Sequence, residues 1–215
     1  MKEIRNYFRY LAYLFVLIGF HCAYAGSRED FFTAIKRDHG NTVESVLRGG
    51  FDPNTVDEQG YPGLVLALRI GSYEAAAALI ESPRLDPDAA NPLGETALML
   101  ACLRGQQAMA ERLFKRGAAV NRVGWTPLHY AASGEDPAIV SWLLDRGADV
   151  DATSANGNTP LMMAAQYGAS ASIDVLLTKG ADVNRLNVAN LSAADFATQA
   201  GREALADMLR RRMKR

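Results

Sequence analysis

Apolar residues of this chain recur at helical spacing in short, paired segments. Between residues 126 and 147, Leu128, Ala131 and Ala132 fall on one face of a predicted helix. A second helix is predicted by apolar residues at the spacing i, i+1, i+4 and i+5, namely Ile139, Val140, Leu143 and Leu144. Gly147 ends this helix, because glycine adopts the left-handed position after a helix at little cost. The polar residues that follow predict an extended turn, so the pattern describes a unit of helix, turn, helix and loop.

The same pattern returns at a fixed interval. The motif Thr-Pro-Leu-His-Tyr-Ala-Ala begins at Thr126, and Thr-Pro-Leu-Met-Met-Ala-Ala begins 33 residues later at Thr159. The motif that closes the second helix, Leu-Leu-x-x-Gly-Ala-Asp-Val, begins at Leu143 and returns after the same interval at Leu176. Self-similarity at this period is typical of a solenoid, in which small units stack and each contacts only its neighbours. The period therefore predicts an all-α solenoid and shifts the functional question from catalysis toward binding.

The aligned motifs divide the chain into five units and a terminal half-unit. Their predicted bounds are 29–61, 62–95, 96–125, 126–158 and 159–191, with a C-terminal cap at 192–215. The fourth and fifth units are regular. The third unit has an exit loop three residues short, and the exit from the second, at residues 81–95, is irregular and rich in proline. The first unit is the most degenerate, as expected at the end of an array.

Residue chemistry explains how each regular unit begins. Thr126 suits the position before the helix, where its hydroxyl accepts a hydrogen bond from a free backbone N–H. Pro127 fits the first helical turn, where the N–H that it lacks would have no helical partner. The alanine pair that follows allows neighbouring helices to approach closely.

The first 25 residues have the pattern of a secretory signal peptide. Lys2, Arg5 and Arg9 precede an apolar run at residues 10–20, and an Ala-x-Ala motif ends at Ala25. The run is shorter than the roughly 20 residues that span a bilayer. We therefore expect cleavage after Ala25 and no stable membrane anchor afterwards. The alternative is that the segment is retained as an anchor.

Composition bounds the nature of the predicted mature domain, residues 26–215. The chain has 23 basic and 24 acidic residues and a formal net charge of −1, which argues against a general nucleic-acid binder. Cys102 is the single cysteine after the predicted cleavage site, so no internal disulfide is expected. A short export signal together with a lack of disulfides favours a periplasmic location in a bacterium.

The repeated motif resembles the ankyrin repeat. Units four and five match Thr-Pro-Leu-His-x-Ala-Ala and Leu-Leu-x-x-Gly-Ala-Asp-Val closely, and unit three matches in part. Units one and two depart from the motif, with Glu29-Asp30 and Pro62-Gly63 in the place of Thr-Pro. The resemblance covers nearly the whole predicted mature chain. It implies an ankyrin repeat solenoid of about five helix-turn-helix units, with short β-hairpin loops and a C-terminal capping half-repeat.

The sequence offers no catalytic constellation. His129 lies in the repeated motif, where the resemblance implies bonds to the backbone and to a neighbouring threonine, and the same interpretation applies to His39. Cys102 replaces the second alanine of a pair and is interpreted as a small buried hydrophobe. Gly-rich phosphate loops and metal-ligand spacings are absent, so we expect no enzyme activity, cofactor or metal. Three carboxylates at equivalent repeat positions are interpreted as turn caps: Asp149, Asp151 and Asp182.

A binding surface is the better candidate for function. The resemblance implies that loop tips and the ends of the first helices form a concave face that contacts other proteins. The candidate protein-binding residues on that face are Tyr61, Arg69, Ile70, Leu103, Arg104, Arg122, Trp125, Gln166 and Tyr167. Aromatic side chains in such a set favour binding, because they contribute much contact energy at little entropic cost.

The two tryptophans receive different interpretations. Trp125 precedes Thr126 in the shortened loop, and it is either an exposed anchor for a partner or packed against a neighbouring loop tip. Trp142 lies on the second helix of its unit beside Leu143, and it is predicted to belong to the core.

Charge is distributed unevenly along the predicted concave face. Basic residues recur at the same helix end in units one to three: Lys36, Arg37, Arg69 and Arg104. This stripe suggests an acidic surface on the partner, since charge complementarity steers association. The alternative is an ordinary solvated helix face.

These observations predict an exported, non-enzymatic protein-protein interaction module that binds its partner through the concave face. One hypothesis makes the chain an accessory or scaffold of a periplasmic enzyme. The alternative is an inhibitor or immunity protein that blocks a toxic enzyme such as a phospholipase. No binding of nucleic acid is expected. The fold specifies a shape and not a target, so the partner itself does not follow from the sequence.

Overall fold

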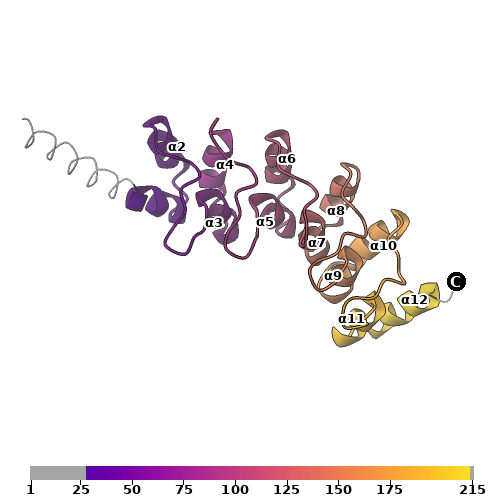
Figure 1. Ribbon diagram of the computed structural model, residues 1–215. Coiled ribbons are helices and arrows are strands. Elements are labelled where there is room, and N and C mark those ends of the chain that lie inside the picture. Colours follow the sequence, from indigo (N-terminus) through magenta and orange to yellow (C-terminus); the bar gives the residue numbers. More distant parts are fainter. Residues whose placement is uncertain (1–27, 214–215) are drawn as a thin grey trace, which may run out of the picture.

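The protein is a stack of short helices. The computed structural model describes residues 28–213 (Figure 1), so the predicted signal peptide lies outside the described residues. Residues 28–36 are helical, and the helices that follow are α2 (Gly40–Arg48), α3 (Gly63–Ile70), α4 (Tyr73–Glu81), α5 (Ala97–Leu103), α6 (Gln107–Lys115), α7 (Pro127–Ser133), α8 (Pro137–Leu144), α9 (Pro160–Gln166), α10 (Ser170–Thr178), α11 (Ala193–Gln199) and α12 (Glu203–Met213). Within the described part, none of these helices is long and apolar enough to cross a bilayer. The predicted all-α solenoid is confirmed.

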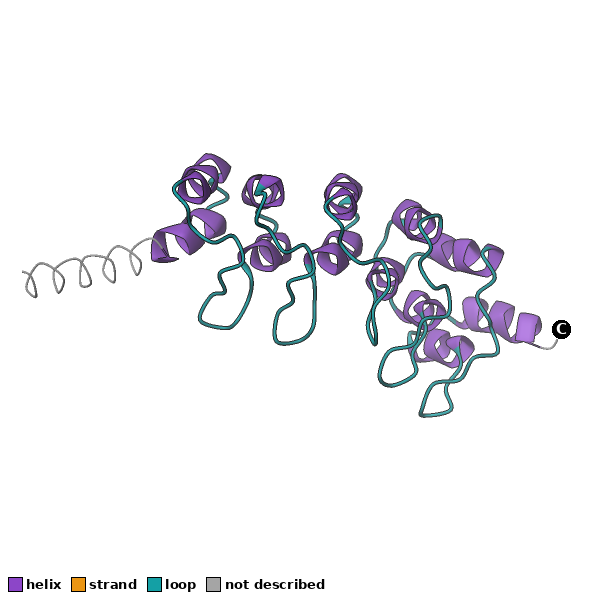
Figure 2. Cartoon of the chain, turned by 45° about the horizontal axis from the view of Figure 1, so that its top comes forward, coloured by secondary structure: helices purple, strands orange, loops and turns teal. Residues whose placement is uncertain are grey.

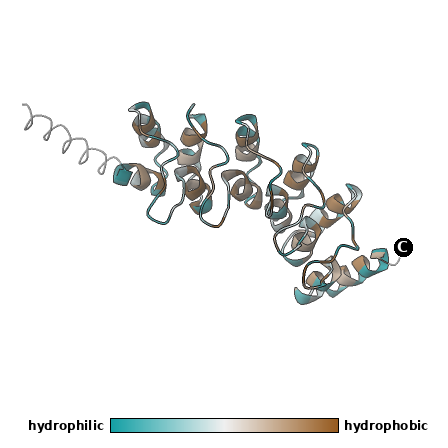
Figure 3. Ribbon diagram, in the orientation of Figure 1, coloured by the Kyte–Doolittle hydropathy of each residue, from teal (hydrophilic) through white to brown (hydrophobic). Residues whose placement is uncertain are grey.

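The helices form two layers with loops along one side. Helices α3, α5, α7, α9 and α11 pack on one another in an inner layer, and each is followed by a helix of the outer layer (Figure 2). The apolar core lies between these layers and runs through the whole stack. Hydropathy follows this division, with hydrophobic residues along the helices and hydrophilic residues prevailing in the loops (Figure 3).

The inner helices begin as the repeated motif predicts. The hydroxyls of Thr96 and Thr159 accept hydrogen bonds from the backbone N–H groups three residues later, at 3.4 and 3.3 Å. Ser192 does the same at the start of α11, at 3.3 Å. Such caps satisfy an N–H group that has no partner inside the helix.

Small residues allow the inner helices to pack closely. Ala101, Ala132 and Ala165 are fully buried in α5, α7 and α9. Cys102 is buried beside them, and this burial raises the pKa of its thiol. Its predicted role as a small hydrophobe is confirmed, because a thiol that stays protonated in the core is a poor nucleophile.

The expected β-hairpins are reduced to single bridges. Among the described residues, two isolated antiparallel bridges occur, Val56 with Pro62 and Ala90 with Thr96, and no strand forms. Side chains close the loops together with a few backbone hydrogen bonds, such as that from the Asp57 N–H to the Tyr61 carbonyl oxygen at 2.9 Å. The carboxylate of Asp57 accepts hydrogen bonds from the backbone N–H groups of residues 59 and 61, at 2.9 and 2.8 Å. Asn91 and Asn187 close the second and last loops in the same way.

A ladder of side-chain to backbone hydrogen bonds joins successive units. Each bond runs from a backbone N–H to an Asn or Asp side chain of the preceding unit: Asp86 to Asn54 at 2.7 Å, Ala119 to Asp88 at 2.9 Å, Asp149 to Asn121 at 2.9 Å and Asp182 to Asp151 at 3.0 Å. The predicted turn role of the recurring carboxylates is confirmed, since Asp149 and Asp182 also accept a hydrogen bond from the N–H two residues later.

Arginines form a second kind of link between units. Arg202 donates to the carbonyl oxygens of Ala164, Ala165 and Gly168 at the end of α9, at 2.9 to 3.0 Å. Arg84 reaches the carbonyl oxygens of residues 50 and 51 in the same manner. The Arg202 link is favourable because the last carbonyls of a helix have no partner within it and carry partial negative charge.

The stack changes direction between α6 and α7 (Figure 1). On the outer side, the rings of Phe114 from α6 and Trp142 from α8 meet edge to face, with centroids 5.8 Å apart, and the Arg146 guanidinium lies 4.3 Å from the Trp142 ring. Helices α6 and α8 approach each other less closely than α8 and α10 do. On the opposite side, the connecting loop at residues 121–125 is the shortened one. Bulk on the outer side and a short connection on the inner side together favour the bend.

Loss of the Arg202 links is expected to destabilise the C-terminal cap. Hydrogen bonds to charged groups contribute about 1.5–3 kcal/mol, so Arg202→Gln should lower the free energy of unfolding by roughly that amount in urea denaturation. Arg211→Gln is the matched control, because Arg211 is exposed and makes no hydrogen bond within the described residues. Equal stability of the two variants would contradict a structural role for Arg202.

Candidate functional site

An apolar hollow opens on the loop side of the stack at the bend. Its volume is about 280 Å³, and it is lined by Leu103, Trp125, His129, Tyr130, Ser133, Met163 and Tyr167. These residues come from α5, α7 and α9 and from the positions that flank them, so three successive units form one site. We call the surface made by the inner helices and the loops the inner face. Among the predicted binding residues, Leu103, Trp125 and Tyr167 meet in this hollow.

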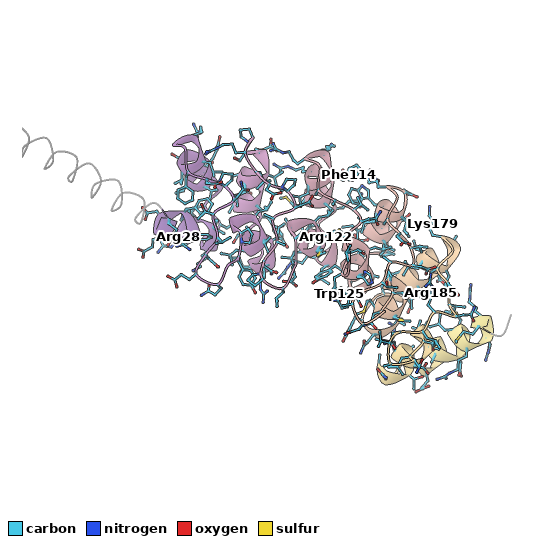
Figure 4. All side chains as sticks on the ribbon, viewed as in Figure 1. Arg28, Phe114, Arg122, Trp125, Lys179 and Arg185 are labelled. Atoms are coloured by element: carbon cyan, nitrogen blue, oxygen red, sulfur yellow. The ribbon has the colours of Figure 1, made fainter. Side chains whose placement is uncertain are left out.

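The two aromatic rings at the edge of the hollow are accessible. Trp125 is 38% exposed and Tyr167 is 62% exposed. Trp125 lies in the region of α7 (Figure 4). Its ring contacts the rings of His129 and Tyr130 edge to face, with centroids 5.2 and 6.4 Å away. Trp125 therefore packs on the helix that follows it, and it keeps more than a third of its surface free for contact.

His129 forms part of the floor and has a structural role. Its Nδ1 accepts a hydrogen bond from the backbone N–H of Thr126 at 3.2 Å, and the Thr126 hydroxyl lies 2.9 Å from the same atom. Because Nδ1 accepts, the proton of the neutral ring is on Nε2, which donates to the carbonyl oxygen of Asn158 at 2.9 Å. Burial lowers the pKa of His129, so the ring is neutral at pH 7. The interpretation from the repeated motif is confirmed.

The other polar groups of the floor are already bonded. The Tyr130 hydroxyl donates to Glu95 at 3.1 Å, and burial together with this carboxylate raises the Tyr130 pKa. The Ser133 hydroxyl donates to the His129 carbonyl oxygen at 2.9 Å. The hollow thus presents an uncharged surface without free polar groups at its base, which suits an apolar side chain.

A polar network around Glu95 borders the hollow on its N-terminal side. Arg69 donates to the Tyr61 hydroxyl at 3.0 Å and to the Glu95 carboxylate at 3.4 Å, and its guanidinium lies 5.0 Å from the Tyr61 ring. Asn91 donates to the same carboxylate at 2.7 Å. Two predicted binding residues, Tyr61 and Arg69, are therefore engaged within the protein and support the loop at residues 91–95.

The remaining predicted residues lie around the hollow without lining it. Ile70 is 46% exposed at the end of α3, and Gln166 is half-buried at the end of α9. Arg122 is half-buried in the shortened loop, and its Nη1 is shielded from solvent with no hydrogen-bond partner in the described part of the chain. Arg104 donates to the backbone carbonyl of Arg69.

The predicted basic stripe is interrupted. The charge of Arg69 faces Glu95, whereas Arg104 forms no ion pair within the described residues. Lys36 and Arg37 are exposed two units away. The spacing of the four residues in the sequence did not show the interruption of the stripe, because a long arginine side chain can reach either solvent or the neighbouring unit. The charge that borders the hollow is therefore that of Arg104.

Sequence reasoning missed Tyr130 and Met163. They occupy the same register, four residues after the capping threonine of units four and five, directly before the alanine pair. This shared register places both residues on the same part of the inner helix, and that signal was available in the sequence. The sequence did not show that Tyr130 and Met163 meet in one hollow, because this contact depends on how far adjacent units rotate at the bend.

Groups that could hold a metal ion are absent from the described residues, where no cluster of three or more His, Cys, Asp or Glu side chains has suitable geometry. Trp142 is buried as predicted, with 6% of its surface exposed.

Comparison with known families and proteins gives a consistent match. A family model described as ankyrin repeats in three copies matches residues 31–123 and 119–187. Protein phosphatase 1 regulatory subunit 27 of Mus musculus is 36% identical over 104 residues, which are 46% of this chain and 68% of that protein.

Two further relatives are much longer proteins. A palmitoyltransferase of Lachancea kluyveri is 30% identical over 121 residues, which are 54% of this chain and 16% of the enzyme. Ankyrin repeat and SAM domain-containing protein 6 of Rattus norvegicus is 34% identical over 109 residues, which are 49% of this chain and 12% of that protein. The chain thus spans less than a fifth of either relative.

The pKa of His129 predicts a pH dependence of stability. The folded-state pKa lies below the ordinary value of 6.5, so the unfolded chain takes up a proton first as the pH falls. The free energy of unfolding should therefore fall from about pH 7 downward until the pH is below the folded-state value. His129→Met should remove this component, as measured by urea denaturation between pH 5 and pH 8, a range set by the ordinary histidine pKa of about 6.5.

Methionine is the suitable replacement because two other units use it. The sulfur atoms of Met99 and Met162 accept the backbone N–H of the capping threonine at 3.4 Å, as Nδ1 of His129 does. His129→Leu is the control, since leucine leaves the Thr126 N–H unsatisfied at a cost of about 1–3 kcal/mol. Parallel pH curves for the wild type and His129→Met would show that another group titrates.

Proposed function

We propose that this chain, which belongs to the ankyrin repeat family, is a non-enzymatic module. It binds another protein through its inner face. The hollow between α5, α7 and α9 is the centre of the proposed contact. Ankyrin repeats are a protein-interaction fold, and a partner of this chain is therefore another protein. No step of the proposal needs a cofactor.

The observation that carries the proposal is the grouping of accessible aromatic rings over an uncharged floor. Trp125 of the third unit and Tyr167 of the fifth border the hollow, and Leu103 completes its wall. Binding energy in protein interfaces concentrates in a few aromatic residues near well-packed pockets. An exposed apolar site of this kind, rimmed by polar residues, is typical of a docking surface.

We further propose that the protein acts outside the cytoplasm, in the periplasm of a bacterium. Support comes from the basic start, short apolar run and Ala-x-Ala motif of residues 1–25. In this setting the module serves as an accessory or scaffold of a periplasmic enzyme. The alternative is an inhibitor or immunity protein that blocks a toxic enzyme. It predicts that the bound enzyme loses activity, whereas an accessory protein or scaffold preserves that activity.

Export predicts a defined N-terminus. Expressed in a bacterium, the protein should be recovered from the periplasmic fraction and should begin at Gly26 by N-terminal sequencing or intact mass. Ala25→Asp should block processing, because signal cleavage requires a small residue at that position. Recovery of the full-length chain from the cytoplasm would contradict the export proposal and leave the binding proposal untouched.

Binding through the hollow predicts which variants lose the partner. The partner is recovered on immobilised protein from an extract of the organism that encodes it, and its affinity is then measured by calorimetry. Tyr167→Ala and Trp125→Ala should each weaken binding by about fivefold or more, as expected for anchor residues that contribute over about 1 kcal/mol. Tyr167 is the cleaner variant, since its exposed ring makes no hydrogen bond within the described residues.

The matched control is Phe114→Ala. Phe114 is exposed to the same extent as Trp125 but lies on the outer side of the stack, against Trp142. The Phe114→Ala substitution should lower thermal stability without weakening the binding of the partner. Equal losses of affinity for the inner and outer variants would contradict the proposed face. The activity of a bound enzyme then distinguishes an accessory protein, which preserves activity, from an inhibitor, which abolishes it.

A further inference from the structure

The edge of the hollow carries hydrogen-bond donors that have no partner. Neither the indole N–H of Trp125 nor the hydroxyl of Tyr167 makes a hydrogen bond within the described residues. At the base, by contrast, every polar side chain of the hollow is bonded inside the protein. A partner group that enters the hollow therefore meets apolar surface at the bottom and donors at the edge.

One cation without an ion pair in the described residues borders the hollow, and a second lies near it in the sequence. Arg104 directly follows Leu103 of the hollow, and its guanidinium donates to one backbone carbonyl and forms no ion pair in the described part of the chain. Arg122 lies three residues before Trp125, and its buried Nη1 has no hydrogen-bond partner among residues 28–213. The nearest acidic group in the network, Glu95, is already bonded to Arg69, Asn91 and Tyr130.

A second, open hollow extends the site beyond Leu103. It shares Leu103 and Ser133 with the apolar hollow and is also lined by Arg104, Glu135 and Asp136. The carboxylate of Asp136 accepts the backbone N–H of Ala138 at the start of α8. Glu135 is the one carboxylate here without a hydrogen bond among the described residues, so it is the group that would compete with a partner for Arg104.

We propose that the partner segment presents a bulky apolar side chain and, next to it, a carboxylate. The apolar side chain fills the hollow between Trp125 and Tyr167, and the carboxylate binds the guanidinium of Arg104. This inference rests on the proposed function and adds the chemistry of the partner. The Arg104 guanidinium carries it, because this cation lies next to the apolar hollow at Leu103, forms no ion pair within the described residues and keeps donors for a partner's carboxylate, whereas Glu135 and Asp136 of the open hollow compete for it.

The geometry of arginine favours a carboxylate as the second contact. A guanidinium has five N–H donors, and Arg104 uses one nitrogen for the Arg69 carbonyl. The remaining donors suit the two oxygens of an acidic side chain or of a chain terminus. Because the apolar floor and the Arg104 cation lie close together, they specify a short motif of the partner rather than a single residue.

A random peptide library displayed on phage is the probe that tests this chemistry. The mature chain, immobilised, should enrich peptides in which a large apolar residue lies within a few positions of Asp or Glu. Enrichment should be lost on Tyr167→Ala. For synthetic versions of the enriched peptides, Arg104→Gln should weaken binding by about two- to fivefold at low salt, the range for an exposed ion pair.

Three further variants separate the contact from net charge. Arg104→Lys keeps the charge and should retain most of the affinity, whereas Glu135→Gln removes the competing carboxylate and should strengthen binding. Lys36→Gln removes one exposed positive charge two units away and should have little effect, because such a charge is screened beyond about 10 Å at 0.1 M salt. Thermal denaturation of each variant checks the fold.

The outcomes distinguish this inference from the proposed function. Peptides that depend on Tyr167 but lack acidic residues, or that bind Arg104→Gln as well as wild type, would overturn the inference and leave the hollow as a binding site. Equal effects of Arg104→Gln and Lys36→Gln would also overturn it. An empty selection, or one indifferent to Tyr167, would count against both.

Discussion

The structure depends on the packing of each helix pair against the next. A single pair of seven- to nine-residue helices cannot bury its apolar faces, so folding requires neighbours on both sides. The buried alanines of the inner layer set how closely the pairs approach. The Asn and Asp ladder then fixes their register, because each of the four junctions between the five units has a side-chain oxygen placed to accept one backbone N–H of the next unit. Stability is therefore shared among junctions, and a local irregularity can change the shape of the stack without ending it.

The bend between the third and fourth units is such an irregularity. The short loop before Thr126 has no room for the Asn or Asp closure that shapes the loops at residues 57–61 and 91–95. Trp125 consequently stands beside α7 instead of behind a loop tip. On the outer side, the Phe114 and Trp142 rings lie between α6 and α8, where smaller residues would allow the two helix backbones to approach. Regular packing and function diverge here, as expected where a chain departs from its own local rules.

Much of the fold could be predicted from the sequence, because the repeat is local. Thr-Pro caps, alanine pairs and terminal glycines each act within one unit, and the role of His129 followed from its place in the motif. The hollow could not be predicted, since Leu103 and Trp125 belong to the third unit and Tyr167 to the fifth, and they meet through the bend. The basic stripe was misleading for a related reason. Arg69 and Arg104 share a register, but one pairs with Glu95 and the other with a backbone carbonyl, and only the neighbouring unit decides which. The expected hairpins are reduced to isolated bridges, because side chains share the closure of the loops with a few backbone hydrogen bonds.

Stability and recognition are separable in this arrangement. The groups that hold the stack, such as the His129 ring and the caps of the inner helices, are buried and bonded, whereas Trp125, Tyr167 and Arg104 are exposed at its surface. On the proposed function, a substitution among the exposed residues changes what the hollow can bind, and it removes little of the packing that orders the helices. The floor can stay constant because it is built from the repeated motif itself. In the proposed binding mode, partner choice resides in the edge of the hollow, where the repeat imposes least, and the irregular junction is the place where a regular scaffold would acquire a particular target.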